Sequence, residues 1–193
     1  MRVAMNRNHQ LLCASGEWAE HIRDDLLPWV LGERTLGGSE LEIGPGPGLT
    51  TDVLRRWTRR LTAVEADPRA ASSLKRRLAG TNVTVINADG IDMPIKRARF
   101  TAGVAMTMLH HVPSIERQDA LFAEVHRVLR RDGWLVGVDT LDSPGFRAFH
   151  RRDVCVPVEP EGLEPRLVAA GFAEVEIERC DHEFRFAARK PKE

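Results

Sequence analysis

The segment LEIGPGPG at residues 41–48 is the feature that most constrains how this 193-residue chain can fold. An apolar run that predicts a strand ends at Ile43, and a helical pattern begins at Leu49. Alternate glycines let the backbone turn tightly and approach a ligand closely, because no Cβ intrudes and a positive φ carries no penalty. We therefore expect a strand, a glycine-rich binding turn and a helix in direct succession.

The chain continues with short apolar runs that alternate with helical patterns as far as residue 139, which predicts an α/β doubly wound fold with a mostly parallel sheet. Asp67 before Pro68 is typical of a helix N-cap, and Ser114 caps a second helix that should end at Asp132 and Gly133. The strands are expected at residues 40–43, 61–65, 83–86, 100–106 and 134–139.

The flanks differ from this core. Residues 17–31 have the apolar spacing of an amphipathic helix, whereas residues 1–15 have no clear period and are interpreted as a lid. Residues 140–162 are rich in proline and predict an irregular substrate loop, followed by a short helix that ends near Gly171. Two alternating segments then predict a C-terminal antiparallel hairpin, which brings the sheet to seven strands.

Composition excludes several classes of function. Lys plus Arg and Asp plus Glu both number 28, and this zero net charge disfavours nucleic acid as a partner and favours a small molecule. No apolar run approaches the roughly 20 residues of a membrane helix, so we expect a cytoplasmic protein with no membrane contact. The three cysteines lack a C-x-x-C spacing and the seven histidines are scattered in sequence, so no metal site is expected.

The pattern Glu42-x-Gly44-x-Gly46-x-Gly48 resembles motif I of the class I S-adenosylmethionine-dependent methyltransferases, of the small-molecule type that acts on ubiquinone and menaquinone precursors. Leu49 stands where the G-x-G-x-x-G fingerprint of dinucleotide enzymes needs glycine, which disfavours NAD. The resemblance implies S-adenosylmethionine as cofactor and a Rossmann-like methyltransferase fold. It implies one domain over residues 1–193, comprising an N-terminal helical and lid segment (1–35), a cofactor-binding core (39–139), and a substrate loop, helix and hairpin (140–193).

The resemblance also assigns roles. In that family the acid that starts motif I holds the methionine ammonium, and the acid that closes the second strand accepts hydrogen bonds from both ribose hydroxyls. Another acid lies near the adenine amine. Carried over to this sequence, the cofactor-binding residues are Glu42, Gly44, Gly46, Gly48, Glu65, Ala66, Asp89, Gly90, Met106 and Thr107.

The stretch MTMLHHVP at residues 106–113 resembles the segment after the fourth strand of the same enzymes, and residues 127–135 resemble the approach to their fifth strand. Thr101 departs from the pattern, because many relatives have Asp there. His110 or His111 is the candidate general base for in-line methyl transfer, since an imidazole titrates near neutral pH. The alternative is that both histidines only fix the turn. Weaker candidates for acceptor contact are His9, His150, Arg151 and Arg152.

Three alternatives stay open. The first half of the chain also resembles the ribosomal RNA adenine dimethyltransferases, but residues 107–110, TMLH, replace their Asn-x-Pro-aromatic motif. A non-catalytic cofactor-binding partner subunit uses the same fold. Aminopropyl transfer is least favoured, because no paired acidic site for a polyamine lies near residues 106–111. The acceptor atom stays open, and Leu26 and Trp29 offer apolar surface either for a homodimer or for packing on the sheet.

Overall fold

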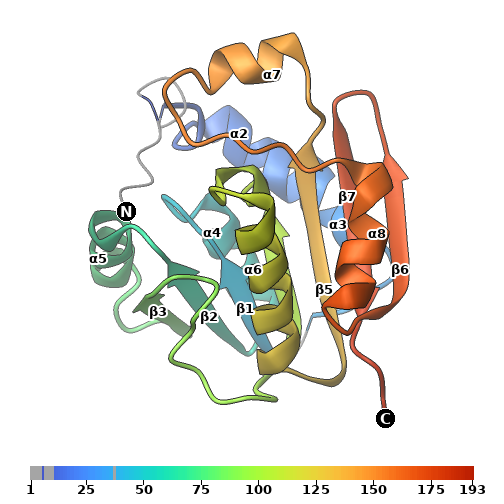
Figure 1. The fold of residues 1–193 in the computed structure, drawn as a ribbon. Coiled ribbons are helices and arrows are strands. Elements are labelled where there is room, and N and C mark those ends of the chain that lie inside the picture. Colours follow the sequence, from blue (N-terminus) through green and yellow to red (C-terminus); the bar gives the residue numbers. More distant parts are fainter. Residues whose placement is uncertain (1–5, 7–10, 37) are drawn as a thin grey trace.

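A seven-stranded sheet in the order β3-β2-β1-β4-β5-β7-β6 forms the centre of the protein (Figure 1). The computed structural model describes residues 6, 11–36 and 38–193. The first five strands run parallel, and β7 pairs antiparallel with both β5 and β6, which confirms the predicted sheet and C-terminal hairpin. The strands are β1 (Ser39–Ile43), β2 (Arg60–Glu65), β3 (Val83–Asn87), β4 (Phe100–Met106), β5 (Leu129–Thr140), β6 (Ala173–Arg179) and β7 (Glu183–Arg189).

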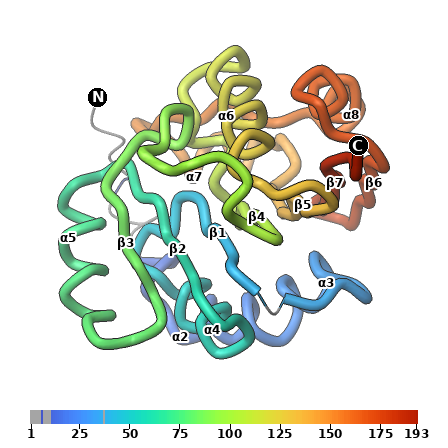
Figure 2. Tube along the Cα trace, turned by 90° about the horizontal axis from the view of Figure 1, so that it is seen from below, coloured from blue at the N-terminus to red at the C-terminus, as the bar shows by residue number. Residues whose placement is uncertain are grey.

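Helices cover both faces of the sheet, as Figures 1 and 2 show. One face packs against α3 (Leu27–Leu31), α4 (Leu49–Trp57) and α5 (Pro68–Arg77), and the other against α6 (Ile115–Val128) and α8 (Pro160–Ala169). Alternation along the strands supplies both cores, since β2 directs Leu61 to the first face and Val64 to the second. The predicted doubly wound arrangement is therefore confirmed.

The amphipathic segment at residues 17–31 is helical but not uniform. It divides into α2 (Gly16–His21), a π-helical turn η1 (Ile22–Leu26) and α3. Pro28 explains the change from α-helix to π-helical turn. Proline has no N–H to donate to the carbonyl four residues earlier, and its ring crowds that carbonyl. Leu26 is buried against the sheet, and the Trp29 indole donates to Glu178 at 2.9 Å, so this apolar face packs within the chain.

Two predictions were wrong, one of a helix end and one of an irregular loop. Helix α6 ends at Val128 rather than at Gly133, because Leu129 is already extended and β5 begins there with an irregularity before Trp134. The loop at residues 140–162 is not irregular throughout: Ser143 caps a short helix, α7 (Pro144–Phe149), above the edge of the sheet (Figure 1). Proline marks helix starts in this stretch, since its fixed φ suits the first helical turn.

Strand order reverses beside β1, because β2 and β3 extend the sheet in one direction and β4 and β5 in the other. Ligands of open α/β sheets bind outside the carboxyl ends of the strands at such a switch point. The glycine-rich turn after β1 and the segment after β4 both lie there.

Among the residues that the structure describes, no helix has the length and apolar character needed to cross a membrane.

A substitution at Gly137 would test the packing at the centre of the sheet. A Cβ there would lie 2.4 Å from the Ala105 carbonyl oxygen and 2.6 Å from the Phe186 ring. Gly137→Ala should lower the free energy of unfolding by about 1–3 kcal/mol, because backbone and ring must both move. Gly162→Ala in α8 is the matched control, since its Cβ meets nothing within 4 Å, and it should be neutral or stabilising by up to about 1 kcal/mol. Urea unfolding measures both, and equal effects would contradict this account of the packing.

Candidate functional site

The glycine-rich turn after β1 is built from left-handed residues. Gly44, Gly46 and Gly48 have φ values of 62°, 54° and 90°, which strain any other residue. A Cβ on Gly44 would lie 3.2 Å from the Met108 side chain, so the turns after β1 and β4 are in close contact. At Gly48, just before α4, a Cβ would lie 2.4 Å from the end of the Leu74 side chain, which adds crowding to the strain of the left-handed conformation.

Glu65, the last residue of β2, holds this turn. Its Oε2 accepts a hydrogen bond from the Gly46 amide at 2.9 Å, and its Oε1 accepts one from the Asp67 amide at 2.8 Å. Burial raises the pKa of Glu65, although the two amides oppose that effect. Each carboxylate oxygen has two lone pairs, so the group can still accept hydrogen bonds from hydroxyls of a ligand.

Glu42 lies one strand away, near the end of β1, and is 2% exposed. Burial raises the pKa of its carboxyl group to about 8. Its Oε2 is buried and makes no hydrogen bond to any residue that the structure describes. A buried oxygen in this state is costly. A cationic ligand would satisfy it and favour the ionised form.

Asp89 and Gly90, after β3, have structural partners. The Oδ1 of Asp89 accepts from the Ile91 amide at 3.2 Å, and its other oxygen forms an ion pair with Arg117 on α6. A Cβ on Gly90 would lie 2.7 Å from the end of the Leu121 side chain, which would have to shift to make room for it. Ala66 is exposed, and its carbonyl accepts from the Asn87 side chain at 3.2 Å. Cofactor contact by these residues stays a prediction.

The chain leaves β4 through an unusual conformation. Met106 ends the strand and is buried, and Thr107 follows with a φ of 47°. A β-branched residue in the left-handed region is strained, and such strain clusters at functional sites. The Thr107 amide donates to the Val138 carbonyl at 2.8 Å, which fixes the turn against β5. The short helix η2 (Leu109–His111) comes next.

His110 forms a buried pair with Asp139 near the end of β5. The Nδ1 of His110 lies 2.5 Å from Asp139 Oδ1, and its backbone amide donates to Oδ2 at 3.2 Å. Burial acts to raise the pKa of Asp139, but the facing imidazole and amides outweigh it and the pKa is lowered. Sequence reasoning missed Asp139 as a site residue. An acid that ends an apolar strand, at the edge where ligands bind, was the available signal.

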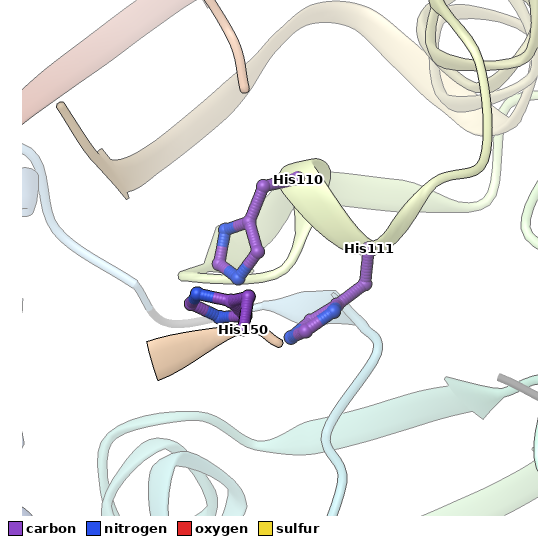
Figure 3. Close-up of side chains that lie close together, drawn as sticks. All are labelled: His110, His111 and His150. Atoms are coloured by element: carbon purple, nitrogen blue, oxygen red, sulfur yellow. The ribbon is translucent and has the colours of Figure 1, made fainter. Parts of the chain in front are cut away.

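Three histidines meet at this place (Figure 3). One ring nitrogen from each of His110, His111 and His150 lies within 4.8 Å of the other two. The expectation that the histidines are scattered was therefore wrong for these three. The segments after β4 and β5 lie at one edge because the two strands are neighbours, and α7 then brings His150 over η2.

The segment at residues 1–15 is described only in part. The Asn6 side chain donates to the Phe149 carbonyl at 2.7 Å and to Asp153 Oδ2 at 3.1 Å, so this position is bonded to the segment that follows α7. His9 lies outside the described residues, and Arg151 and Arg152 are exposed. The lid interpretation of residues 1–15 stays a prediction.

Thr101, the departure from the family pattern, lies far from this edge. It occupies the second position of β4, at the amino end of the sheet. Its hydroxyl donates to Glu40 Oε1 at 3.0 Å and accepts from the Ser39 amide at 3.3 Å. Thr101 therefore links β4 to β1 and lies away from the candidate site.

Comparison with known proteins identifies the family. Residues 41–137 match the family model of the methyltransferase domain. The chain is 27% identical over 170 residues to a rice (Oryza sativa subsp. japonica) protein, 2-methyl-6-phytyl-1,4-hydroquinone methyltransferase 1, covering 85% of this chain and 49% of the relative. It is 38% identical over 130 residues to ribosomal RNA small subunit methyltransferase A of Desulfitobacterium hafniense, covering 63% and 45%. The chain thus spans less than half the length of each of these relatives.

A solved structure shows the same fold. Phosphoethanolamine N-methyltransferase 2 of Haemonchus contortus, in complex with S-adenosylhomocysteine, superposes with a TM-score of 0.73 at 15% identity, over 92% of this chain and 53% of that one. The chain therefore belongs to the methyltransferase domain family of class I S-adenosylmethionine-dependent methyltransferases.

The raised pKa of Glu42 predicts a change in stability with pH. Because the pKa rises from 4.5 in the unfolded chain to about 8 in the folded protein, the folded state binds more protons between these values, and stability falls as pH rises through this window. Glu42→Gln removes the titration, so its free energy of unfolding should gain a few kcal/mol relative to wild type between pH 5 and pH 8. Urea unfolding at both pH values measures the difference, and parallel profiles would contradict it.

Proposed function

We propose that this chain binds S-adenosylmethionine at the carboxyl edge of β1 and β2 and transfers its methyl group to a small-molecule acceptor held near β4 and β5. One observation carries the proposal: two buried acidic side chains, Glu42 and Glu65, lie on either side of a left-handed glycine turn. The unbonded oxygen of Glu42 suits an ammonium group, and the fixed carboxylate of Glu65 suits a pair of hydroxyls.

The other predicted contacts follow the order of the strands. Asp89 and Gly90 line the position for the adenine, and Met106 and Thr107 form the wall where the cofactor and acceptor meet. When bound, S-adenosylmethionine supplies a methyl group on a positively charged sulfur, which is already electrophilic. The protein then has to align the acceptor atom and exclude water, and such alignment is worth several kcal/mol.

His110 is the candidate base. An ionised Asp139 accepts the Nδ1 proton, which leaves the Nε2 lone pair to take a proton from the acceptor. Asp139 is then a positioning residue, as is the carboxylate of a Ser-His-Asp triad. Hydroxyl acceptors fit this arrangement best, and a hydroquinone, named in the rice relative, is the first to test.

Ribosomal RNA adenine methylation is the second candidate. The 38% identity to the Desulfitobacterium protein favours it. The TMLH sequence at residues 107–110 and the zero net charge favour a small acceptor instead, because RNA binding draws much of its affinity from basic residues.

The cofactor site can be tested by calorimetry with S-adenosylmethionine and S-adenosylhomocysteine. We expect micromolar binding that Glu65→Ala and Gly46→Val each weaken at least tenfold, because the first removes a carboxylate from the site and the second forces valine into a left-handed turn. Glu164→Ala, an exposed position on α8, is the control and should bind as wild type. No binding by the folded wild-type protein would overturn the proposal.

Transfer of a radiolabelled methyl group tests the acceptor and the base. We expect transfer to hydroquinones or phenols, and His110→Ala should lower kcat by about 10²–10⁴ while the cofactor Kd is unchanged. Asp139→Asn should also lower kcat and shift the pH profile, whereas the exposed His21→Ala should do neither.

Three results would contradict this assignment. Unchanged turnover in His110→Ala excludes that residue as the base. Transfer to ribosomal RNA alone establishes the second candidate. Tight cofactor binding with no transfer to either class of acceptor indicates a non-catalytic partner subunit.

A further inference from the structure

We propose that His110, His111 and His150 form a binding site for one divalent transition-metal ion, with zinc as the best match. The three rings come from η2 and from the end of α7, and they face one another in Figure 3. Their centroids lie 4.1 Å apart for His110 and His111, 4.7 Å for His110 and His150, and 5.4 Å for His111 and His150.

Every ring directs its Nδ1 at an oxygen. The acceptors are Asp139 Oδ1 at 2.5 Å from His110, the Val154 carbonyl at 3.0 Å from His111 and the Phe146 carbonyl at 2.9 Å from His150. Because these oxygens can only accept, each Nδ1 carries the proton and each Nε2 carries a lone pair. Metal-binding histidines have this arrangement, in which a carboxylate or carbonyl fixes the ring and its tautomer.

The spacing suits an ion after a small adjustment. Nitrogens bound to zinc lie 2.0–2.1 Å from the ion and therefore about 3.4 Å from one another in a tetrahedral site. The ligand atoms of the three histidines lie within 4.8 Å of one another, so the atoms need to approach by at most about 1.4 Å. His111 is only half-buried, so of the three rings it is the one least enclosed by the protein.

The surroundings favour a reactive site over a purely structural one. Three histidines leave a fourth position of a tetrahedral ion for water or substrate, as in catalytic zinc sites. The Phe146 ring packs edge-on against His110 at 5.0 Å and lies 4.3 Å from His150, which makes one wall of the site apolar.

This inference also names an acceptor class, and that part rests on the proposed methyl transfer. An acceptor hydroxyl or thiol at the open position would lose its proton to solvent more readily, because the ion lowers the pKa of the bound group. A lone pair of the acceptor atom forms the new bond to the methyl carbon. At the same time the sulfur–methyl bond breaks, and the electron pair of that bond stays on the sulfur. With the ion bound, the imidazole lone pairs are occupied, so the ion replaces His110 in activating the acceptor.

Cobalt(II) is the probe, since low-coordinate Co²⁺ gives visible absorption bands. Full-length protein, freed of metal by a chelator, is titrated with Co²⁺ and then with Zn²⁺. We expect one Co²⁺ per chain with micromolar affinity, visible bands, and loss of those bands as Zn²⁺ displaces the cobalt. His150→Phe, which keeps an aromatic ring beside Phe146 and Phe149, and His111→Ala should each weaken binding at least a hundredfold. His21→Ala and His126→Ala are controls and should bind as wild type.

Thermal unfolding of each variant first establishes that it is folded. Failure of folded wild-type protein to bind Co²⁺ below 100 µM, or unchanged binding in both His150→Phe and His111→Ala, would overturn the metal site. Calorimetry with S-adenosylmethionine on the same samples separates the two proposals. Cofactor binding without cobalt binding refutes only the metal site, and cobalt binding without cofactor binding refutes only the proposed function.

Discussion

Parallel pairing of β1 with both β2 and β4 is the constraint on which the rest of this structure depends. It brings the carboxyl ends of five strands to one side of the sheet and places there the point where the strand order reverses. The turns that leave β1 and β4 must then pass side by side, and they contact one another through Gly44 and Met108. Gly44 and Thr107, which follow β1 and β4 directly, both have left-handed conformations.

The same edge collects polar groups that the protein must stabilise away from water. Each is stabilised by a different means. Backbone amides bond to Glu65, an imidazole faces Asp139, and Glu42 is favoured in its protonated form with a pKa of about 8. Under the proposed function, a cationic group bound beside Glu42 would replace this proton. Burial of the acid lowers the stability of the protein at neutral pH, and a positive charge is the kind of group that would offset this cost.

Much of the fold could be predicted because strands, helices and tight turns each have a signal within a few neighbouring residues of the sequence. Strands β1 to β4 were predicted to within one residue at each end, since buried parallel strands are short apolar runs, and the glycine turn was evident from its spacing. Strand β5 begins five residues before its predicted start. The end of α6 was misplaced because Leu129 continues the apolar stripe of the helix while its backbone is already that of β5. Helix α7 was missed because six residues give no periodic signal.

The part of the candidate site around the histidines could not be predicted, and the reason differs from that for the helix ends. Glu42 and Glu65 were predicted through a family motif that the sequence carries intact. The neighbourhood of His110, Asp139 and His150 depends instead on the sheet order, which places β5 beside β4, and no spacing in the sequence encodes that order. Separations of 29 residues between His110 and Asp139 and 43 between His111 and Val154 make these contacts tertiary.

The carboxyl ends of β1 to β3 and those of β4 and β5 also differ in how they relate to the family. The matched methyltransferase domain ends at residue 137, two residues before Asp139 and well before α7. The cofactor half, formed by β1, β2 and β3, therefore lies within the shared domain, while the oxygens that fix the three histidines lie beyond it. Because these oxygens fix the Nδ1–H tautomer and leave a lone pair on Nε2, they suit both the proposed base and the proposed metal site. In the proposed base and the proposed metal site alike, the segment after residue 137 supplies the oxygens that fix the histidine rings.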